Sequence, residues 1–227
     1  MQNIAQQLNS VREKVRSAER KYARPENSVS LLAVSKTRSV AEILQAIEQG
    51  QLDFGENYQQ EVKTKLPALS GKDINWHFIG PLQSNKARII AENFCWIHSV
   101  DRLKIAERLS ALRPSHLPDL NVCIQLNISD ETSKSGVNTS ELMSLAESIV
   151  SLPGLKLRGL MALPAPTDEF AQQRKDFRRL REFLDQLVSA GHDVDTLSMG
   201  TTNDMEAAIA EGATIVRIGT ALFGPRL

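Results

Sequence analysis

Short apolar, β-branched runs alternate with longer amphipathic stretches along almost the whole chain, and this alternation limits the possible folds. The runs that we predict to be strands lie at residues 30–35, 53–55, 75–79, 96–99, 121–127, 156–162, 196–199 and 214–218. Between them, apolar residues recur at helical spacing at residues 40–49, 84–93, 102–112, 140–151, 169–190 and 204–211. Strands that alternate with helices indicate right-handed βαβ units and a parallel sheet.

Eight such units within 227 residues fit a compact (β/α)8 TIM barrel, a fold that needs roughly 200 residues or more. A doubly wound open sheet is the alternative. No G-x-G-x-x-G motif follows a predicted strand, so the dinucleotide-binding form of that alternative has no support. We find no linker or repeat and expect one domain over residues 1–227.

The first 24 residues are predicted to add a helix that packs on the barrel. Their apolar residues recur at helical spacing, and Arg24 and Pro25 end the pattern. The residues of this stripe are Ile4, Leu8, Val11, Val15, Ala18 and Tyr22.

Charge and cysteine content exclude several classes of protein. The 27 basic and 27 acidic side chains balance, which argues against a nucleic-acid or anionic-membrane partner. The sequence shows neither an apolar run of about 20 residues nor an apolar signal core at the N-terminus, so we expect a cytoplasmic protein. Cys95 and Cys123 lack metal-ligand spacing and are predicted to be buried thiols; no metal site is expected.

Active sites of such barrels form at the carboxyl ends of the strands. The residues at these ends are Lys36, residues 56–58, residues 80–83, Asn127, Met161, residues 198–202 and residues 217–220. Lys36 directly follows an apolar strand, and burial in the barrel mouth would lower the pKa of its amine from about 10.4. A neutral amine is what Schiff-base chemistry requires. The alternative, a lysine that extends into solvent, stays open.

The loops after the last two strands have the composition of a phosphate site. Barrels frequently bind phosphate at this place, where glycine permits close approach and hydroxyl groups donate hydrogen bonds. The first loop contains Ser198, Gly200, Thr201 and Thr202, and the second contains Gly219 and Thr220. Ordinary turn formation and helix capping are the alternative for each loop.

Two further features have structural explanations as well as functional ones. His77 lies within a predicted strand and is either a general base or a hydrogen-bonded core residue. The helix at residues 169–190 carries a basic run beside acidic residues, which is typical of a salt-bridged, solvated face. A docking surface for a partner protein is the alternative for this run.

Several longer motifs carry a family resemblance. They are LLAVSKT at residues 31–37, FGENY at 54–58, WHFIGPLQSNK at 76–86, HSVDR at 98–102, LNISDETSKSG at 126–136, RGLMALPAP at 158–166 and VRIGTALFG at 216–224. Together they resemble the pyridoxal phosphate homeostasis proteins, a family similar to the barrel domain of the alanine racemases. The resemblance extends over essentially the whole chain and implies a (β/α)8 barrel.

The resemblance also implies a cofactor and its ligands. Pyridoxal 5'-phosphate (PLP) would form a Schiff base with Lys36, Arg217 would face the pyridine nitrogen, and Asn57 would complete the site. The phosphate would bind at Ser198, Gly200, Thr202, Gly219 and Thr220. The chain departs from the family at Thr201, where methionine is usual, but Thr202 keeps the hydroxyl group.

These residues lead us to expect a carrier of PLP that serves vitamin B6 and amino-acid homeostasis without robust catalytic turnover. An arginine only donates hydrogen bonds, so the ring nitrogen facing Arg217 would stay unprotonated and stabilise a carbanion poorly. Racemases of this type add a second base, and neither Tyr22 nor Tyr58 is an evident candidate. We expect a monomer, with PLP-dependent apoenzymes as possible recipients. A weak amino-acid racemase, a Schiff-base aldolase and a protein-docking scaffold are the alternatives.

Overall fold

Within residues 3–128 and 135–225, which the computed structural model describes, eight parallel strands pair in chain order and close into a barrel. β1 pairs with both β2 and β8, so the sheet has no free edge. The strands are β1 (Ser30–Val34), β2 (Asp53–Glu56), β3 (Asn75–Phe78), β4 (Trp96–Val100), β5 (Leu120–Gln125), β6 (Leu155–Met161), β7 (Thr196–Ser198) and β8 (Ile215–Ile218). The predicted barrel is confirmed, and each strand overlaps a predicted segment.

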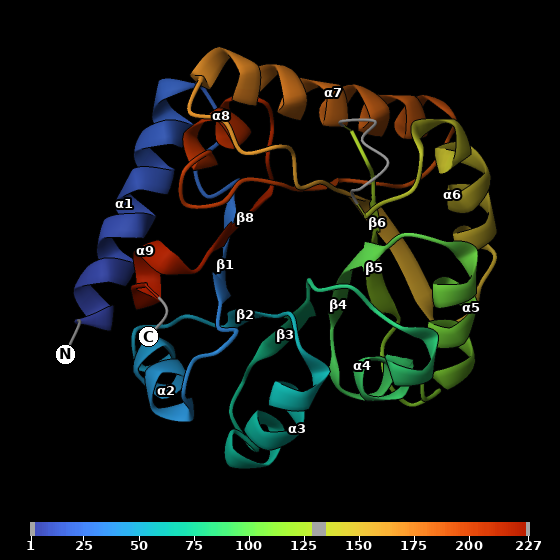
Figure 1. Ribbon diagram of the computed structural model, residues 1–227, viewed down its shortest axis with the longest axis horizontal. Helices are drawn as coiled ribbons and strands as arrows, with labels where there is room; N and C mark the ends of the chain where they lie inside the picture. Colours follow the sequence, from blue (N-terminus) through green and yellow to red (C-terminus); the bar gives the residue numbers. More distant parts are fainter. Residues whose placement is uncertain (1–2, 129–134, 226–227) are drawn as a thin grey trace.

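The helices surround the barrel (Figure 1). They are α1 (Ile4–Lys21), α2 (Val40–Glu48), α3 (Gln59–Ala68), α4 (Ala87–Asn93), α5 (Leu103–Leu112), α6 (Leu142–Val150), α7 (Phe170–Ser189), α8 (Met205–Ala210) and α9 (Thr220–Phe223), with short 3₁₀ turns at η1 (Ser84–Lys86) and η2 (Thr139–Glu141). Part of the motif at residues 126–136 lies outside the described residues.

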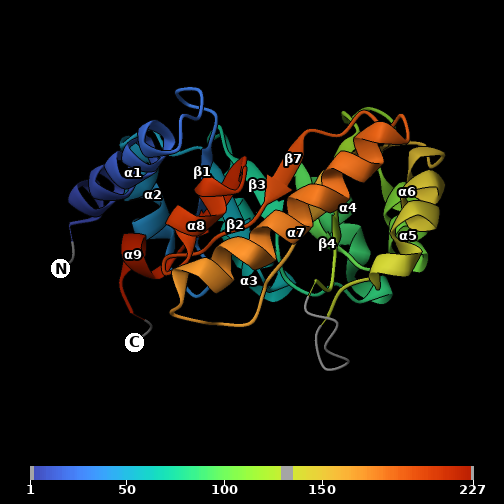
Figure 2. The same ribbon diagram turned by 90° about the horizontal axis from the view of Figure 1, so that it is seen from above.

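The N-terminal helix lies against three neighbours in the outer layer. One face of α1 buries Ile4, Leu8, Val11 and Val15, and the helix contacts α2, α8 and α9. Figure 2 shows α8 between α1 and α7, and α7 runs along the side of the barrel. The predicted helix within residues 1–24 is therefore present. Its apolar stripe from Ile4 to Ala18 is the face that it buries, whereas Tyr22 follows the last helical residue and is half-buried.

Ion pairs attach α7 to the end of α8. Glu211 is only 1% exposed, and Arg174, Arg178 and Arg181 approach its carboxylate oxygens at 2.7, 2.9 and 3.2 Å. The basic run is salt-bridged, as predicted, but these three arginines pair with a buried carboxylate at the end of α8 and not with an acidic residue beside the run. Reversing these three charges would disrupt helix packing, so such variants do not test a docking surface.

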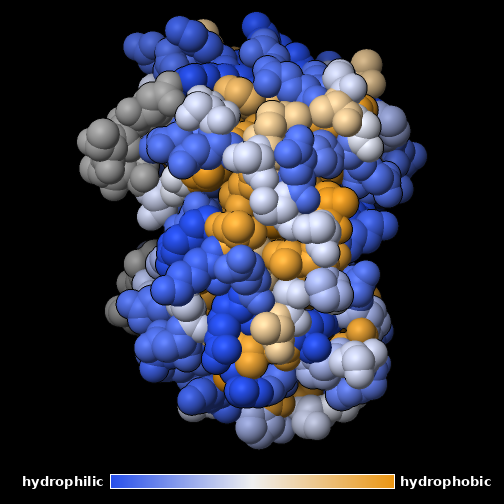
Figure 3. Space-filling view, turned by 90° about the vertical axis from the view of Figure 1, so that its right-hand side faces the viewer, coloured by the Kyte–Doolittle hydropathy of each residue, from blue (hydrophilic) through white to orange (hydrophobic). Residues whose placement is uncertain are grey.

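The surface over α5 and α6 has an apolar centre. Hydrophobic residues gather in the middle of this face, and hydrophilic residues surround them (Figure 3). Val150 on α6 is the most exposed of the large hydrophobic side chains that reach the described surface, at 57%. Among the described helices, none is both long enough and apolar enough to span a membrane.

Candidate functional site

A cavity of about 350 Å³ lies at the carboxyl ends of β1, β2, β3, β7 and β8. Six of the residues predicted for the site line it: Lys36, Asn57, Thr202, Arg217, Gly219 and Thr220. Gly200 lines an adjoining hollow of about 270 Å³ that shares Arg217 with the cavity. The structure therefore brings together most of the predicted site residues, although they are far apart in the sequence.

Lys36 is half-buried and stands on a tight turn that follows β1. The turn spans residues 35–38 and is closed by the Arg38 amide, which donates to the Ser35 carbonyl at 3.0 Å. Thr37 has φ 63°, a left-handed conformation that is unfavourable for a β-branched residue. The backbone thus turns sharply just after Lys36, at the edge of the cavity.

Side chains from β2 and α3 hold this turn, and the two from α3, Glu61 and Lys65, were not predicted from the sequence. The Lys65 ammonium donates to the Ser35 carbonyl, to Glu56 and to Glu61 at 2.8, 2.8 and 3.1 Å. Glu61 also accepts from the Thr37 amide at 2.6 Å. A signal was available, because Glu61 and Lys65 are four residues apart and so share one face of a helix.

Glu56 is fully buried beneath the turn. Burial raises the pKa of Glu56 despite the opposing effect of the Lys65 ammonium. One of its oxygens accepts from Lys65 and from the Ser35 hydroxyl, and among the described residues the other oxygen has no hydrogen-bond partner. The support of the Lys36 turn therefore includes a buried carboxylate that depends on Lys65 for its charge balance.

Asn57 offers a hydrogen-bond acceptor at the cavity. Its Oδ1 atom is buried and has no partner among the described residues. The backbone of Asn57 is packed against Gly80, where a Cβ atom would lie only 2.2 Å from the Asn57 carbonyl oxygen. The GPLQ motif after β3 thus begins with glycine because the loop bearing Asn57 passes too closely for a side chain.

The loop after β7 is shaped by Gly200 and Asp204. Gly200 has φ 91°, and a Cβ atom there would lie 2.6 Å from the Cβ of Ala208 in α8. Asp204 accepts from the amide and the hydroxyl of Thr201, the latter at 2.8 Å. The side chain of Thr201 is therefore engaged within the loop, whereas Thr202 is exposed at the cavity.

Arg217 is a buried cation in the wall of the cavity, with 5% of its surface exposed. Its guanidinium donates to the hydroxyl and carbonyl oxygens of Ser198 and to the Ala162 carbonyl. Burial lowers the pKa of Arg217 to about 10, partly offset by Asp204, so the side chain stays protonated at neutral pH. Three of its five N–H groups serve protein acceptors, which leaves donors for a ligand.

Ser198, which was predicted to bind the phosphate group, is the last residue of β7. It is fully buried and is not among the residues that line the cavity. Its hydroxyl oxygen lies 2.8 Å from Arg217 Nη1 and 2.7 Å from the Nδ1 atom of His98. Sequence reasoning assigned no role to His98, and only the closing of the barrel brings this histidine next to Ser198.

Other predicted groups lie elsewhere. Asn127 and Met161 are buried and do not line the cavity. Cys123 is buried, as predicted, which raises the pKa of its thiol to about 12, whereas Cys95 was also predicted to be buried but is half-buried. Within the part of the chain that the structure describes, His, Cys, Asp and Glu side chains form no cluster able to hold a metal ion.

Comparisons with known proteins agree with this architecture. The family model for the alanine racemase N-terminal domain matches residues 6–226. The pyridoxal phosphate homeostasis protein of Pseudomonas aeruginosa is 55% identical over the whole chain and 97% of that relative.

Solved structures show the same fold. PipY of Synechococcus elongatus, solved with PLP bound, is 35% identical with a TM-score of 0.85, over 97% of this chain and 100% of PipY. Alanine racemase from Corynebacterium glutamicum shares the fold at 16% identity and a TM-score of 0.70, over 96% of this chain and 61% of the racemase. This chain belongs to the pyridoxal phosphate homeostasis protein family, which is built on the alanine racemase N-terminal domain.

Proposed function

We propose that this protein binds PLP covalently through the Lys36 amine and stores and releases it, instead of turning over an amino acid. The observation that carries the proposal is a single cavity of about 350 Å³ that brings Lys36, Arg217 and two Gly/Thr-containing loops together. The PLP-bound structure of PipY and the name of the curated relatives support the choice of cofactor.

The residues of the cavity fit the parts of this cofactor. When bound, PLP supplies an aldehyde that condenses reversibly with an amine, and Lys36 offers that amine. The hydroxyl groups of Thr202 and Thr220 and the backbone at Gly219 suit a phosphate group. The orphaned Asn57 Oδ1 atom would be satisfied by a donor on the ligand.

Arg217 would weaken the cofactor as an electron sink. Its guanidinium stays charged at neutral pH and only donates hydrogen bonds, so a ring nitrogen facing it must accept. A ring nitrogen without a proton withdraws electrons less strongly. This feature favours holding the cofactor over carbanion chemistry on amino acids.

The cavity also offers a single base. Among the described residues that line it, Lys36 alone carries an amine, and the Arg217 guanidinium stays protonated at neutral pH. Tyr58 is 47% exposed and lines a neighbouring groove, and the Tyr22 hydroxyl donates to Glu206 at 2.9 Å. Racemisation with bases on opposite faces therefore lacks its second group, which supports a carrier role.

Visible absorption tests the binding proposal. Purified protein given PLP and then desalted should keep a yellow chromophore, and Lys36→Ala should lose it. Lys86→Ala, which removes an exposed lysine beside the neighbouring groove, should keep the chromophore and serves as the matched control. A Lys36→Ala protein that retains the absorption band would reject the assignment.

Chiral analysis tests the absence of turnover. The PLP-loaded protein incubated with L-alanine should form no more D-alanine than free PLP does at the same concentration. Sustained formation of D-alanine that disappears in Lys36→Ala would replace the carrier by a racemase.

Transfer to other proteins is part of the same proposal. Protein loaded with PLP should restore activity to a PLP-dependent apoenzyme, at a rate set by the release of the cofactor. We also expect the purified protein to sediment with the mass of a monomer. An apoenzyme that stays inactive beside the loaded protein, but responds to free PLP, would contradict the release step.

A further inference from the structure

A line of buried polar side chains crosses the barrel from Arg217 to the opposite end. Arg217 Nη1 lies 2.8 Å from Ser198 Oγ, which lies 2.7 Å from Nδ1 of His98. His98 Nε2 lies 2.9 Å from Nδ1 of His77, and His77 Nε2 lies 3.2 Å from a carboxylate oxygen of Asp53. The five residues come from β8, β7, β4, β3 and β2.

The chemistry of these groups fixes the direction of every hydrogen bond. The ionised carboxylate of Asp53 only accepts, so His77 donates to it from Nε2. A neutral imidazole has one donor and one acceptor nitrogen, so His77 Nδ1 accepts from His98 Nε2, and His98 Nδ1 is left as an acceptor. The Ser198 hydroxyl therefore donates to His98 Nδ1, while its oxygen accepts from Arg217, which only donates. All bonds therefore point from the cation to the carboxylate.

The environment supports this protonation state. Burial lowers the pKa of His98 well below its usual range, and the neighbouring His77 and Arg217 act in the same direction. Burial also lowers the pKa of His77, against the effect of Asp53. Burial opposes the charge on Asp53, but hydrogen bonds from His77 and Asn75 outweigh it and lower the pKa of Asp53. Two neutral histidines thus connect an ionised acid to an ionised base.

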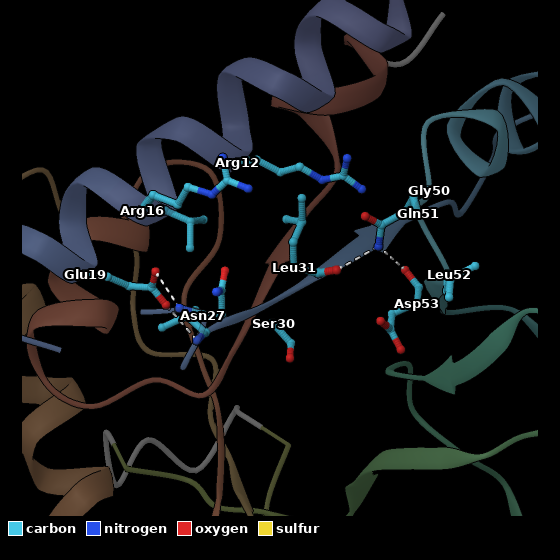
Figure 4. Close-up of a pocket in the computed structure, with 12 residues that line it drawn as sticks. Arg12, Arg16, Glu19, Asn27, Ser30, Leu31, Gly50, Gln51, Leu52 and Asp53 are labelled. Atoms are coloured by element: carbon cyan, nitrogen blue, oxygen red, sulfur yellow. Dashed lines mark hydrogen bonds between the residues drawn. The ribbon is translucent and has the colours of Figure 1, made fainter. Parts of the chain in front are cut away.

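Asp53 reaches water at the other end of the barrel. It lines a pocket of about 320 Å³ into which Arg12 and Arg16 extend from α1 (Figure 4). The Asp53 side chain is 37% exposed, whereas the two histidines are buried. The chain of hydrogen bonds therefore ends on a partly exposed carboxylate at the face opposite the cofactor cavity.

Arg217 needs such an anchor because it is buried without a direct counter-ion. No carboxylate of the described residues lies within 4 Å of its guanidinium, and its protein partners are two carbonyl groups and the Ser198 hydroxyl. Aligned hydrogen bonds strengthen one another in a medium of low dielectric constant. The chain of hydrogen bonds therefore both fixes the Arg217 guanidinium in place and stabilises its charge.

We propose that Ser198, His98, His77 and Asp53 are positioning residues that hold Arg217 in place to donate to the ring nitrogen of the cofactor. The ring-nitrogen contact rests on the proposed function, but the hydrogen-bond chain is a property of the protein alone. Ser198 acts here through Arg217 and not on the phosphate group.

Nitrogen-15 NMR of the protein without PLP tests the chain directly. His77 and His98 should both be neutral Nε2–H tautomers at neutral pH, with His98 Nδ1 accepting a hydrogen bond that Ser198→Ala abolishes. The exposed His116 provides a reference imidazole, assigned with His116→Gln. An Nδ1–H tautomer or a charged imidazole at His98 would overturn the proposal, whatever the protein does with PLP.

Binding of PLP tests the positioning role. Ser198→Ala keeps both backbone acceptors of Arg217 but breaks the chain, so the dissociation constant should rise about tenfold, the effect of one lost hydrogen bond. The absorption maximum of bound PLP should shift, and Ser198→Thr should restore both values. Ser110→Ala, which loses a serine hydrogen bond to Pro153 outside the barrel, is the control.

The two proposals fail in different ways. Ser198→Ala protein with an unchanged dissociation constant and an unchanged spectrum would overturn the positioning role while PLP binding stands. Wild-type protein that never acquires the chromophore would overturn the proposed function. The NMR result would still decide whether the chain of hydrogen bonds from Arg217 to Asp53 exists.

Discussion

At the residue scale, the turn that carries Lys36 depends on charges behind it. Thr37 adopts a left-handed conformation with φ 63°, which costs about 1 kcal/mol or more for such a residue. The hydrogen bonds of its amide to Glu61 and of the Ser35 carbonyl to Lys65 offset that cost. The position of Lys36 is therefore stabilised by side chains of α3 and β2, and not by the turn alone.

Removing Lys65 should destabilise the protein strongly. Lys65→Met leaves the Glu56 carboxylate buried without its cation, which should lower the free energy of unfolding by about 3 kcal/mol in urea denaturation. Lys63→Met, which removes an exposed lysine on the same helix, should change it little. Adding Glu56→Gln to Lys65→Met should recover part of the loss. Equal stability of the two single variants would contradict the role of the buried pair.

Gly200 can be tested against a glycine of matched conformation. Gly200 and Gly191 both have φ 91°, so alanine suffers the same backbone strain at each. Only at Gly200 does the new Cβ collide with Ala208, whereas nothing lies within 4 Å at Gly191. Gly200→Ala should therefore lower the unfolding free energy by about 1–3 kcal/mol more than Gly191→Ala in the same denaturation assay. An equal loss of unfolding free energy in the two variants would show that the loop after β7 accommodates the new Cβ atom without destabilisation.

At the scale of elements, strands and long helices were predictable and short or weakly amphipathic helices were not. The eight strands coincide with the short segments between the helical patterns, which the sequence displays directly. α3 escaped prediction because Pro67 lies within it and its apolar residues form a weak stripe. α9 is a single turn, too short for a period to be recognised. Missing α3 also concealed Glu61 and Lys65, the residues that hold the Lys36 turn.

The attachment of α7 to α8 should be sensitive to acid. Burial alone would raise the pKa of Glu211, but hydrogen bonds from Arg178 and Arg174 outweigh it and lower the pKa. A lowered pKa in the folded state contributes stability above the unfolded value of about 4.3 and loses it as the pH falls. Glu211→Gln should therefore reduce stability at pH 7 and flatten its decline below pH 5.

Thermal unfolding between pH 3 and pH 7 measures this effect. Glu182→Gln removes an exposed carboxylate from α7 and should reproduce the wild-type curve. If Glu211→Gln also reproduced the wild-type dependence of stability on pH, the ion pairs of Glu211 with the arginines would not be what attaches α7 to α8.

At the scale of the whole molecule, closure of the barrel creates what local patterns could not reveal. The strand-end rule listed Lys36, Asn57 and Arg217, and the structure brings these three residues to one cavity. The hydrogen bond between His98 and Ser198 joins residues 100 positions apart, and no local spacing encodes it. Ser198 was therefore predicted at the correct end of its strand, but its partners in the structure are His98 and Arg217, whereas the predicted partner was a phosphate group.

Borohydride reduction of the PLP-loaded protein, followed by peptide mass analysis, tests the central claim most directly. Reduction makes the bond between the cofactor and its amine permanent, so the modified residue can be identified. We expect a mass increase of one reduced PLP on the peptide that contains Lys36. An adduct on another lysine, or no adduct on a protein that is otherwise folded, would contradict it.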